Sequence, residues 1–394
     1  MNFTVNHLFF FSSALVLVLL LLLIWERVSV ANALKHLPWR IHVNGTRGKS
    51  SVTEYICAVL QANTDHACGK ITGILPTFID ASMRKILLKR RGPARIQEQF
   101  STIRRAVKKN CDTLVLECMS IDPELQKVES RFFQPNVTVL TNIRDDHFES
   151  MGKDINEHAD ALISSISSGV EYIVASKSDF SEKIVARATE IGARWIKPNN
   201  FVKDDEIIKY PGVFTDNINL AICACECMGI QAEGAKKSIL SYIDSQINNT
   251  IIICNTIDNK KIHFINSFAV NDIPSLITFF EKNINSELPV VALINTRRDR
   301  PLRSVQFAQW LCEQNIFKKF IIMGDHQSKM KQLLLPGPVS KESIITWNGN
   351  DIDQLFKIVT DGFEQEIQLI GMANIAGKAL RLLEEIKKHG SNNI

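Results

Sequence analysis

A glycine-containing segment near the start of the chain carries the residue types that bind phosphate. An apolar run at 41–43 leads into NGTRGKSS (44–51), and a helical pattern follows from about Ser50 to Gln61. Glycines let backbone N–H groups turn inward around phosphate oxygens, a lysine adds positive charge, and a serine hydroxyl suits Mg²⁺. The N-terminus of the helix adds partial positive charge. We therefore predict a phosphate site made by Asn44, Gly45, Thr46, Arg47, Gly48, Lys49, Ser50 and Ser51.

This loop departs from the longer form of the motif. The pattern G-x-x-x-x-G-K-[ST] requires glycine at position 43, where the chain has Val43. A G-x-x-G-K-S run can also arise by chance. The strand before it and the helix after it supply the context that a phosphate loop needs, so the prediction stands.

Two further strand ends carry groups that bind metal ions. The apolar run at 113–116 ends in Glu117, and the run at 137–140 is followed by polar residues up to His147. Open α/β sheets place their ligands at the carboxyl ends of parallel strands. We predict that Ser50, Glu117 and His147 bind a metal ion there. The alternatives are an ion-paired or capping carboxylate and a histidine with no functional role.

The N-terminal region contains a long apolar run, HLFFFSSALVLVLLLLLIW (7–25). About 20 helical residues cross the hydrocarbon core of a bilayer. No Lys or Arg precedes the run and no small-residue cleavage site follows it, which favours an uncleaved anchor at 1–25 over a signal peptide. Arg27, Lys35 and Arg40 come after it, so the positive-inside rule predicts a single-pass protein of the cell membrane with a cytoplasmic body.

After the anchor, buried-strand runs alternate with helical patterns, which predicts the α/β class with a parallel sheet between helices. Asn-rich QINNT and DNKK interrupt the alternation near 245–265. We therefore expect a phosphate-binding domain at 38–250 and a smaller, Rossmann-like α/β domain at 251–394. The net charge is only +4, so we expect no nucleic-acid partner.

Nine cysteines are scattered along the chain without the paired spacing of a zinc site. Cys223, Cys225 and Cys227 alternate along an apolar helical stretch. We expect buried thiols in a reducing compartment rather than a metal site.

A basic stretch, MRKILLKRRGPARI (83–96), lies between the phosphate loop and Glu117. Such a run is commonly a solvated face. The alternative is a track that holds a polyanion by charge-assisted hydrogen bonds. Both readings remain open at this point.

Taken together, these motifs resemble a known family. The segment NGTRGKSSVT (44–53), the strand-end Glu117 and TNIRDDHFESMG (141–152) are similar in order and spacing to the central ATPase domain of the Mur ligase superfamily, which carries the shortened loop G-T-x-G-K-[ST]-[ST]. The closer resemblance is to poly-γ-glutamate synthase ligases of the CapB or PgsB type. It rests on the N-terminal apolar helix, ECM (117–119), FAVND (268–272), RRDR (297–300) and GMANIAG (371–377).

The resemblance implies ATP and Mg²⁺ as cofactors and assigns roles to residues. Lys49 and Ser50 would contact phosphate and Mg²⁺, and Glu117 and His147 would be Mg²⁺ ligands. Asn217 would touch the nucleotide base; its alternative role is a helix N-cap. The C-terminal domain would close over ATP and substrate with Asp272, Arg297, Asp299 and Arg300, of which Arg300 is a catalytic candidate.

Three departures from the superfamily pattern bear on this transfer. The predicted helix at 156–168 has no lysine, whereas many members carry a carbamylated lysine there. The linker at 241–263 has no arginine for the γ-phosphate, so Arg297, Arg298 or Arg300 would serve instead. The phosphate loop follows the anchor so closely that no UDP-sugar domain fits between them.

The function implied is an ATP-dependent amide ligase that activates the carboxylate of a glutamate chain as an acyl phosphate and joins it to the amino group of glutamate. Expected partners are glutamate, the poly-γ-glutamate chain, the membrane and small membrane subunits of a capsule synthase; a homo-oligomer is left open. The alternatives are a membrane-bound P-loop ATPase that drives a partner and a ligase like folylpolyglutamate synthase.

Overall fold

The chain folds into two compact units. One contains Met1–Lys203 and Phe214–Leu240, and the other contains Asp204–Val213 and Ser241–Ile394, so the change of unit falls inside one helix, Ala232–Ile247 (α10). The computed structural model describes residues 2–391 apart from 65, 73–75, 91, 93, 145–153, 208–209, 211–212, 248–250, 257, 269, 271–272, 299–300, 365 and 376.

The first unit is built on an eight-stranded sheet of order β4-β3-β2-β5-β1-β6-β7-β8. Its strands are parallel except at one edge, where β3 runs antiparallel to both β2 and β4. The strands are β1 (Trp39–Asn44), β2 (Ala67–Ile71), β3 (Thr77–Ile79), β4 (Lys85–Leu87), β5 (Thr113–Glu117), β6 (Val137–Leu140), β7 (Tyr172–Ala175) and β8 (Arg194–Ile196).

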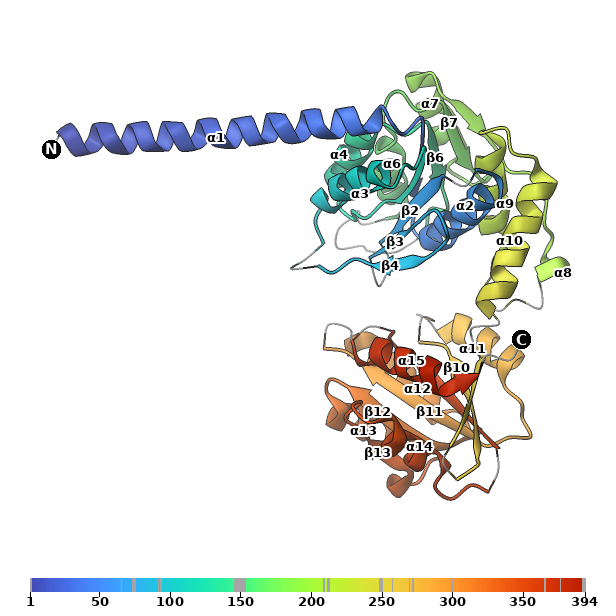
Figure 1. Ribbon diagram of the computed structural model, residues 1–394. Helices are drawn as coiled ribbons and strands as arrows, with labels where there is room; N and C mark the ends of the chain where they lie inside the picture. Colours follow the sequence, from blue (N-terminus) through green and yellow to red (C-terminus); the bar gives the residue numbers. More distant parts are fainter. Residues whose placement is uncertain are drawn as a thin grey trace. The chain divides into compact units, whose positions relative to one another are not determined.

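Helices pack around this sheet (Figure 1). Local signals set some of their ends: Asp122 caps α4 with Pro123 in its first turn, and Asp154 caps α6. The helices are α1 (Asn2–Leu34), α2 (Lys49–Thr64), α3 (Gln97–Lys108), α4 (Pro123–Phe133), α6 (Ile155–Ser164), α7 (Ser181–Ile191), α9 (Thr215–Glu226) and α10.

Helix α1 is apolar over a length that can cross a membrane. The stretch Phe10–Leu34 meets the length and hydropathy of a span, and 6% of its most apolar window is buried. Its last turns are different: Val30, Ala33 and Leu34 pack into the core beside α3 and β5. The helix is therefore seated in the first unit at its base and projects from it (Figure 1).

The second unit has a seven-stranded sheet of order β13-β12-β11-β14-β10-β9-β15, in which β9 pairs antiparallel with β10 and β15. The strands are β9 (Ile251–Asn255), β10 (Lys261–Asn266), β11 (Val290–Thr296), β12 (Phe317–Gly324), β13 (Ile344–Thr346), β14 (Glu366–Met372) and β15 (Gly390–Ser391). The helices are α8 (Asp204–Ile207), α11 (Ile273–Asn283), α12 (Pro301–Cys312), α13 (Gln327–Leu334), η1 (Lys341–Ser343), α14 (Ile352–Thr360) and α15 (Lys378–His389).

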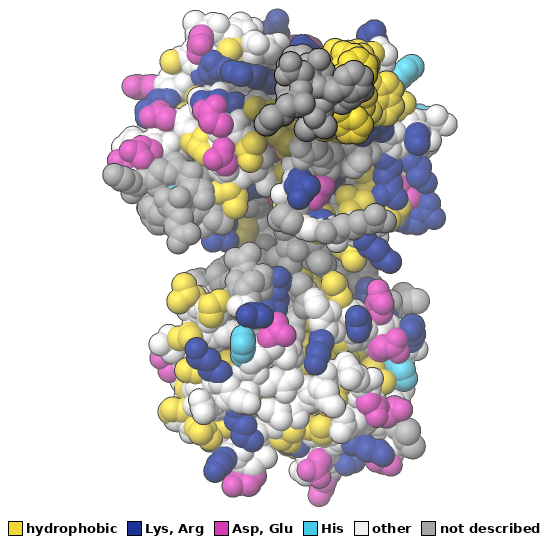
Figure 2. Space-filling view, turned by 90° about the vertical axis from the view of Figure 1, so that its left-hand side faces the viewer, with side chains coloured by type: hydrophobic (Ala, Val, Ile, Leu, Met, Phe, Trp, Pro, Cys, Tyr) yellow, Lys and Arg dark blue, Asp and Glu magenta, His cyan; other side chains and the backbone are white. Residues whose placement is uncertain are grey.

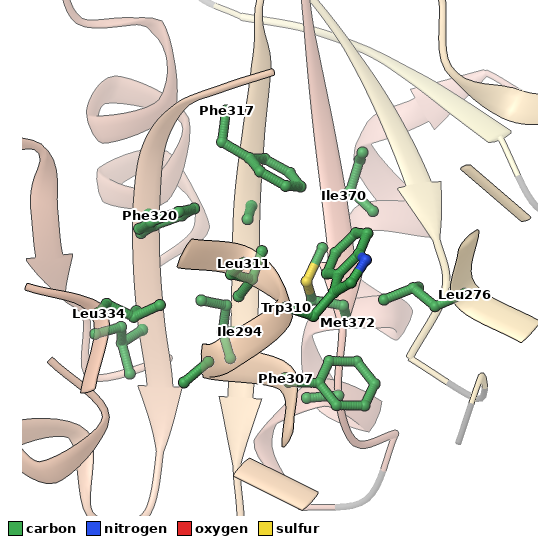
Figure 3. Close-up of a cluster of buried hydrophobic side chains, with 14 of the residues drawn as sticks. Leu276, Ile294, Phe307, Trp310, Leu311, Phe317, Phe320, Leu334, Ile370 and Met372 are labelled. Atoms are coloured by element: carbon green, nitrogen blue, oxygen red, sulfur yellow. The ribbon is translucent and has the colours of Figure 1, made fainter. Parts of the chain in front are cut away.

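One core of the second unit contains several aromatic side chains among aliphatic ones (Figure 3). The Trp310 ring lies 5.1 Å from the Phe280 ring and 6.2 Å from the Phe317 ring, in edge-on arrangements. Such pairs add to the free energy gained by burying the rings. A second apolar cluster that includes Phe264, Phe268 and Trp347 completes the hydrophobic packing of this unit.

The predicted α/β class with an N-terminal apolar helix is confirmed, with corrections in detail. The sheets are mixed rather than wholly parallel, because short edge strands add on in antiparallel fashion. Strand β9 lies within the region 245–265, between the two Asn-rich runs that we expected to interrupt the pattern. The helix after the phosphate loop begins at Lys49 and continues to Thr64, past the expected end at Gln61.

The cysteines follow the prediction in part. Cys68 and Cys111 form a disulfide with Cα atoms 6.1 Å apart, so the expectation of thiols throughout is wrong for this pair. The other seven are free, and burial raises the pKa of Cys223 to about 12 and of Cys227 to about 11. Thiols held protonated in this way are poor metal ligands, which agrees with the reading of buried structural cysteines.

Candidate functional site

The two glycines of the loop between β1 and α2 occupy positions that a side chain would block. Gly45 has φ +126° and Gly48 has φ +85°, both in the region that favours glycine. A Cβ atom would lie 2.2 Å from Thr141 Oγ1 at Gly45 and 2.5 Å from Asn217 Oδ1 at Gly48. The loop therefore depends on glycine at both positions, and it leads directly into the N-terminus of α2.

The residues after β6 hold this loop in place. The Thr46 N–H donates to the Asn142 carbonyl at 2.9 Å, and the Arg47 N–H donates to Asn142 Oδ1 at 3.0 Å. The Arg47 carbonyl in turn accepts from Thr141 Oγ1 at 2.6 Å and from Asn142 Nδ2 at 2.9 Å. These bonds fix the loop before any ligand binds, which lowers the cost of ordering it.

Asn44 and Lys49 take different places in the loop. Asn44 is buried, and its amide donates to Gln126 and Ser165 while its oxygen accepts from the Gly45 N–H at 2.8 Å. Its polar groups are thus occupied within the protein, so it shapes the loop. Lys49 Nζ donates to the Gly45 carbonyl at 2.7 Å and to the Thr46 carbonyl at 3.3 Å. The ammonium group therefore lies against the loop's backbone.

Ser50 and Glu117 come together at the start of α2. Ser50 Oγ donates to Glu117 Oε2 at 2.9 Å, and the Thr72 N–H donates to the same oxygen at 2.7 Å. Burial raises the pKa of the Glu117 carboxyl, and the Lys49 charge and these hydrogen bonds oppose the rise. A hydroxyl and a carboxylate beside a phosphate loop are oxygen donors that suit a hard divalent cation.

Asn217 lies beside the loop, although it is distant in sequence. It is the third residue of α9, and its amide is the group that a side chain at Gly48 would meet. The N-cap of α9 is Phe214, so the alternative reading of Asn217 as an N-cap is wrong.

The other two predicted loop residues are placed as follows. Ser51 lies in the first turn of α2, and the Arg47 side chain is exposed.

The remaining predicted residues lie outside the described part of the chain or in the second unit. His147, Asp272, Asp299 and Arg300 lie outside the described residues. Arg297 is half-buried and follows β11 in the second unit, where the neighbouring Arg298 N–H donates to Asp325 Oδ2 at 3.1 Å. Helix α6 carries no lysine.

A buried polar network behind the site has no counterpart in the sequence prediction. The Glu129 carboxylate accepts from Gln99 Nε2 at 2.6 Å, from Ser120 Oγ at 3.1 Å and from the Met119 N–H at 3.3 Å. Gln99 Nε2 also donates to the Glu117 carbonyl at 3.1 Å. The network therefore fixes the backbone that directly follows the Glu117 side chain. Its members come from three separate segments, so no local motif could reveal it.

His42 and Cys118 border the same carboxylate. His42 Nε2 lies 3.5 Å from Glu129 Oε1, outside hydrogen-bond geometry, and Cys118 Sγ lies 3.8 Å from Glu129 Oε2. Three atoms of metal-ligand type thus fall within 4.8 Å of one another. Since other protein donors already occupy both oxygens of Glu129, the arrangement is accounted for as a structural network.

The basic stretch is largely neutralised within the described residues. Arg84 pairs with Asp80 at 2.9 Å, Lys85 with Glu54 at 2.9 Å, and Arg90 with Glu98 at 2.7 Å. Lys89 and Arg95 are exposed. These pairs favour a surface stabilised by its own carboxylates, and they leave fewer cations for a polyanion than the sequence suggests.

Comparison with known proteins agrees with this architecture. Residues 43–205 match the family described as the Mur ligase middle domain, and residues 253–389 match the C-terminal domain of poly-gamma-glutamate synthase CapB. The PGA synthase CapB of Bacillus subtilis (strain 168) is 26% identical over 361 residues, which cover 90% of this chain and 91% of that protein. The capsule biosynthesis protein CapB of Bacillus anthracis is 27% identical over 374 residues, covering 92% and 79%.

Solved structures share the fold. A bifunctional folylpolyglutamate synthase/dihydrofolate synthase from Yersinia pestis, complexed with AMPPNP and Mn ion, has a TM-score of 0.62 at 14% identity and covers 92% of this chain and 93% of its own. MurF from Acinetobacter baumannii has a TM-score of 0.59 at 10% identity, with 92% and 78% covered. The chain is thus a member of the Mur ligase superfamily, a class of ATP-dependent amide ligases. Within that superfamily it belongs to the CapB type, as the sequence predicted.

Proposed function

We propose that this chain is the ligase subunit of a poly-γ-glutamate capsule synthase, which joins glutamate to the terminal carboxylate of a glutamate chain through a γ-amide bond. The likeness to two CapB proteins over 90% or more of the chain supports this substrate class. The observation that carries the chemistry is the contact of Ser50 Oγ with Glu117 Oε2 at 2.9 Å. Two oxygen atoms that can bind a metal ion thus lie beside a loop suited to phosphate.

The residues of the loop fit ATP and Mg²⁺. Backbone N–H groups around Gly45 and Gly48, together with Lys49, would hold the phosphates. Ser50 and Glu117, with His147 as the sequence predicts, would hold Mg²⁺, and the bound ion would neutralise charge on the phosphate oxygens. Asn217, beside Gly48, is the candidate for contact with the nucleotide base.

In the proposed reaction, a carboxylate oxygen of the glutamate chain attacks the γ-phosphorus of ATP, and ADP leaves. The amino group of the incoming glutamate then attacks the acyl carbon of the acyl phosphate, loses a proton, and displaces phosphate. The products are a γ-amide, ADP and phosphate. No protein nucleophile is needed, so catalysis rests on positioning and on charges such as that of Lys49.

The parts of the chain divide this work in the proposal. The anchor at 1–25 would hold the enzyme at the cell membrane beside small membrane subunits, with its body in the cytoplasm. The domain at 38–250 would bind ATP. The domain at 251–394 would bind glutamate and close over ATP, which Asp299 would also contact. Arg297, Arg298 or Arg300 would reach the γ-phosphate in place of an arginine in the linker.

The test is ADP release by the full chain in membranes, with ATP, Mg²⁺ and labelled glutamate. We expect release to depend on glutamate and the label to enter a product of increasing length. Lys49→Ala should abolish both while the protein still reaches the membrane, because it removes positive charge from the phosphate site. ADP release that ignores glutamate would instead favour an ATPase that drives a partner. Label joined only to an added folate would favour the folylpolyglutamate synthase reading.

A further inference from the structure

Helix α4 presents an apolar face to solvent. Leu125 and Val128 are 47% and 45% exposed, and with the half-buried Phe132 they follow the i, i+3, i+7 spacing of one helix face. Ile121, 43% exposed, comes just before the helix. Exposed apolar side chains that gather on one helix face commonly mark a surface that binds another protein or a membrane.

This face continues into a groove at the base of α1. The groove has a volume of about 450 Å³ and lies between α1 and the helices α3 and α4. Its apolar walls are formed by Leu23, Val30, Leu34, Phe100, Val128 and Phe132. The same surface therefore includes the apolar helix that projects from the unit and the exposed face of α4.

The length of α1 sets the level of the groove relative to a bilayer. A helix rises 1.5 Å per residue, so the apolar run at 7–25 spans about 28 Å, close to the thickness of the hydrocarbon core. Leu23 then falls at the edge of that core. Val30 lies about 10 Å further along the helix, which is the depth of the headgroup region. The groove thus opens where lipid headgroups and the first methylene groups would be.

The charges at the rim suit an anionic lipid surface. Arg27 and Arg131 line the groove and are exposed, and no carboxylate pairs with either one within the part of the chain that the structure describes. The one acidic residue of the lining, Glu26, lies 3.9 Å from Arg104. Figure 2 views the face from which α1 projects and shows Lys and Arg side chains near its apolar residues. Basic groups beside an apolar helix face are typical of interfacial membrane binding.

We propose that the exposed face of α4 and the groove beside α1 form a membrane-docking surface, which inserts Leu125 and Val128 into the interface of an anionic bilayer. This inference rests on the proposed anchoring by α1. Its consequence concerns the site: α4 begins six residues after Glu117, and Glu129 of the same helix holds the turn that follows Glu117. Docking would therefore orient the phosphate-loop unit on the membrane by the helix that supports the metal-binding carboxylate.

The test places an environment-sensitive fluorophore at Val128→Cys in the full chain, reconstituted into phosphatidylcholine vesicles with or without phosphatidylglycerol. Cys227→Ser and Cys312→Ser remove the two half-buried thiols. Val185→Cys on α7 is the matched control, since Val185 is 43% exposed but lies on another helix. We expect a blue shift and several-fold stronger quenching by brominated acyl chains at position 128 than at 185. Arg27→Gln with Arg131→Gln should remove the part of the quenching that needs phosphatidylglycerol.

Three results would overturn the inference. Equal quenching at 128 and 185 in an anchored protein would show that α4 stays in water. A signal at 128 that changes with protein concentration but ignores the quenching lipid would assign the face to a second copy of the chain. Release of the protein by alkaline carbonate would remove the anchoring on which the inference rests. Glutamate-dependent ADP release in the same vesicles tests the proposed ligase function separately.

Discussion

Single residues define the phosphate loop, and Gly48 is one of the two positions in it that exclude a side chain. Its backbone conformation favours glycine, and a Cβ atom there would meet the Asn217 amide at 2.5 Å. Gly48→Ala should therefore destabilise the protein by about 1–3 kcal/mol and abolish binding of an ATP analogue. Thermal unfolding and fluorescence titration would measure the two effects.

Gly229 provides the matched control. It has the same φ, +85°, but nothing lies within 4 Å of the Cβ position. Gly229→Ala should show the cost of backbone strain alone and leave nucleotide binding intact. The steric argument fails if both variants lose stability equally and both still bind the analogue.

Glu117 is the carboxylate that we propose as a ligand of the metal ion. Glu117→Gln keeps the shape of the side chain but removes its charge, so the affinity for Mn²⁺ in the presence of ATP analogue should fall about tenfold or more. Electron paramagnetic resonance would count the bound Mn²⁺. Glu190→Gln on α7, where the carboxylate is 67% exposed, should leave the affinity unchanged. Unaltered Mn²⁺ binding in the Glu117 variant would place the metal elsewhere.

At the scale of elements, α4 supports the site through Glu129. Burial alone would raise the pKa of Glu129, but the His42 ring beside it and hydrogen bonds from Gln99 and Met119 lower it below the ordinary value. A carboxyl with a lowered pKa stabilises the fold at pH values above its unfolded pKa. That contribution disappears as the pH falls through the lower, folded-state pKa.

Glu129→Gln should accordingly cost about 3 kcal/mol near neutral pH, because it removes a buried charge whose partners remain. The difference from the unaltered chain should shrink on acidification below the ordinary carboxyl pKa. Urea unfolding at a series of pH values gives this difference directly. A constant difference at all pH values would show that the variant acts only through packing.

The sequence predicts the elements whose signals are local. Strand β1, the glycine turn and α2 lie within one continuous segment, so the phosphate loop could be recognised from spacing alone. The Glu129 network could not, because Gln99, Met119 and Glu129 meet only after three segments have folded. The antiparallel edge strands were missed for a related reason: β3 and β4 have three residues each, too few to show a period.

Asn217 illustrates the same limit at the candidate site. Its sequence context fits an N-cap and a ligand contact equally well. The start of α9, with Phe214 as its N-cap, removes the first reading. The packing of α9 against α2 then brings the Asn217 amide beside Gly48. The basic stretch at 83–96 is easily seen in the sequence, but its neutralisation is not. The carboxylates that pair with it lie at 54, 80 and 98, and some of these positions are distant from it in sequence.

At the scale of the whole molecule, the exposed part of α1 would hold the protein at the membrane, whereas the two folded units carry the residues of the proposed chemistry. Its last turns belong to the core through Val30, Ala33 and Leu34, whereas residues 10–24 are exposed. Deletion of 1–25 should therefore leave the first unit folded and able to bind an ATP analogue, but should release it from membranes and lower polymer output. Cell fractionation and polymer assay would test this, with full-length Lys49→Ala as the anchored, inactive control. Full polymer yield from the released chain would show that tethering is dispensable.

The central claim is that the chain transfers the γ-phosphoryl group of ATP to a glutamate-chain carboxylate before the amide forms. A γ-glutamyl acceptor labelled with oxygen-18 in its terminal carboxylate tests it most directly, because the carboxylate oxygen that attacks the γ-phosphorus must leave with phosphate. We predict one labelled oxygen in each phosphate released by the full chain and one amide bond for each ADP. Phosphate that takes its fourth oxygen from solvent, with no label from the acceptor, would contradict the account and identify ATP hydrolysis instead.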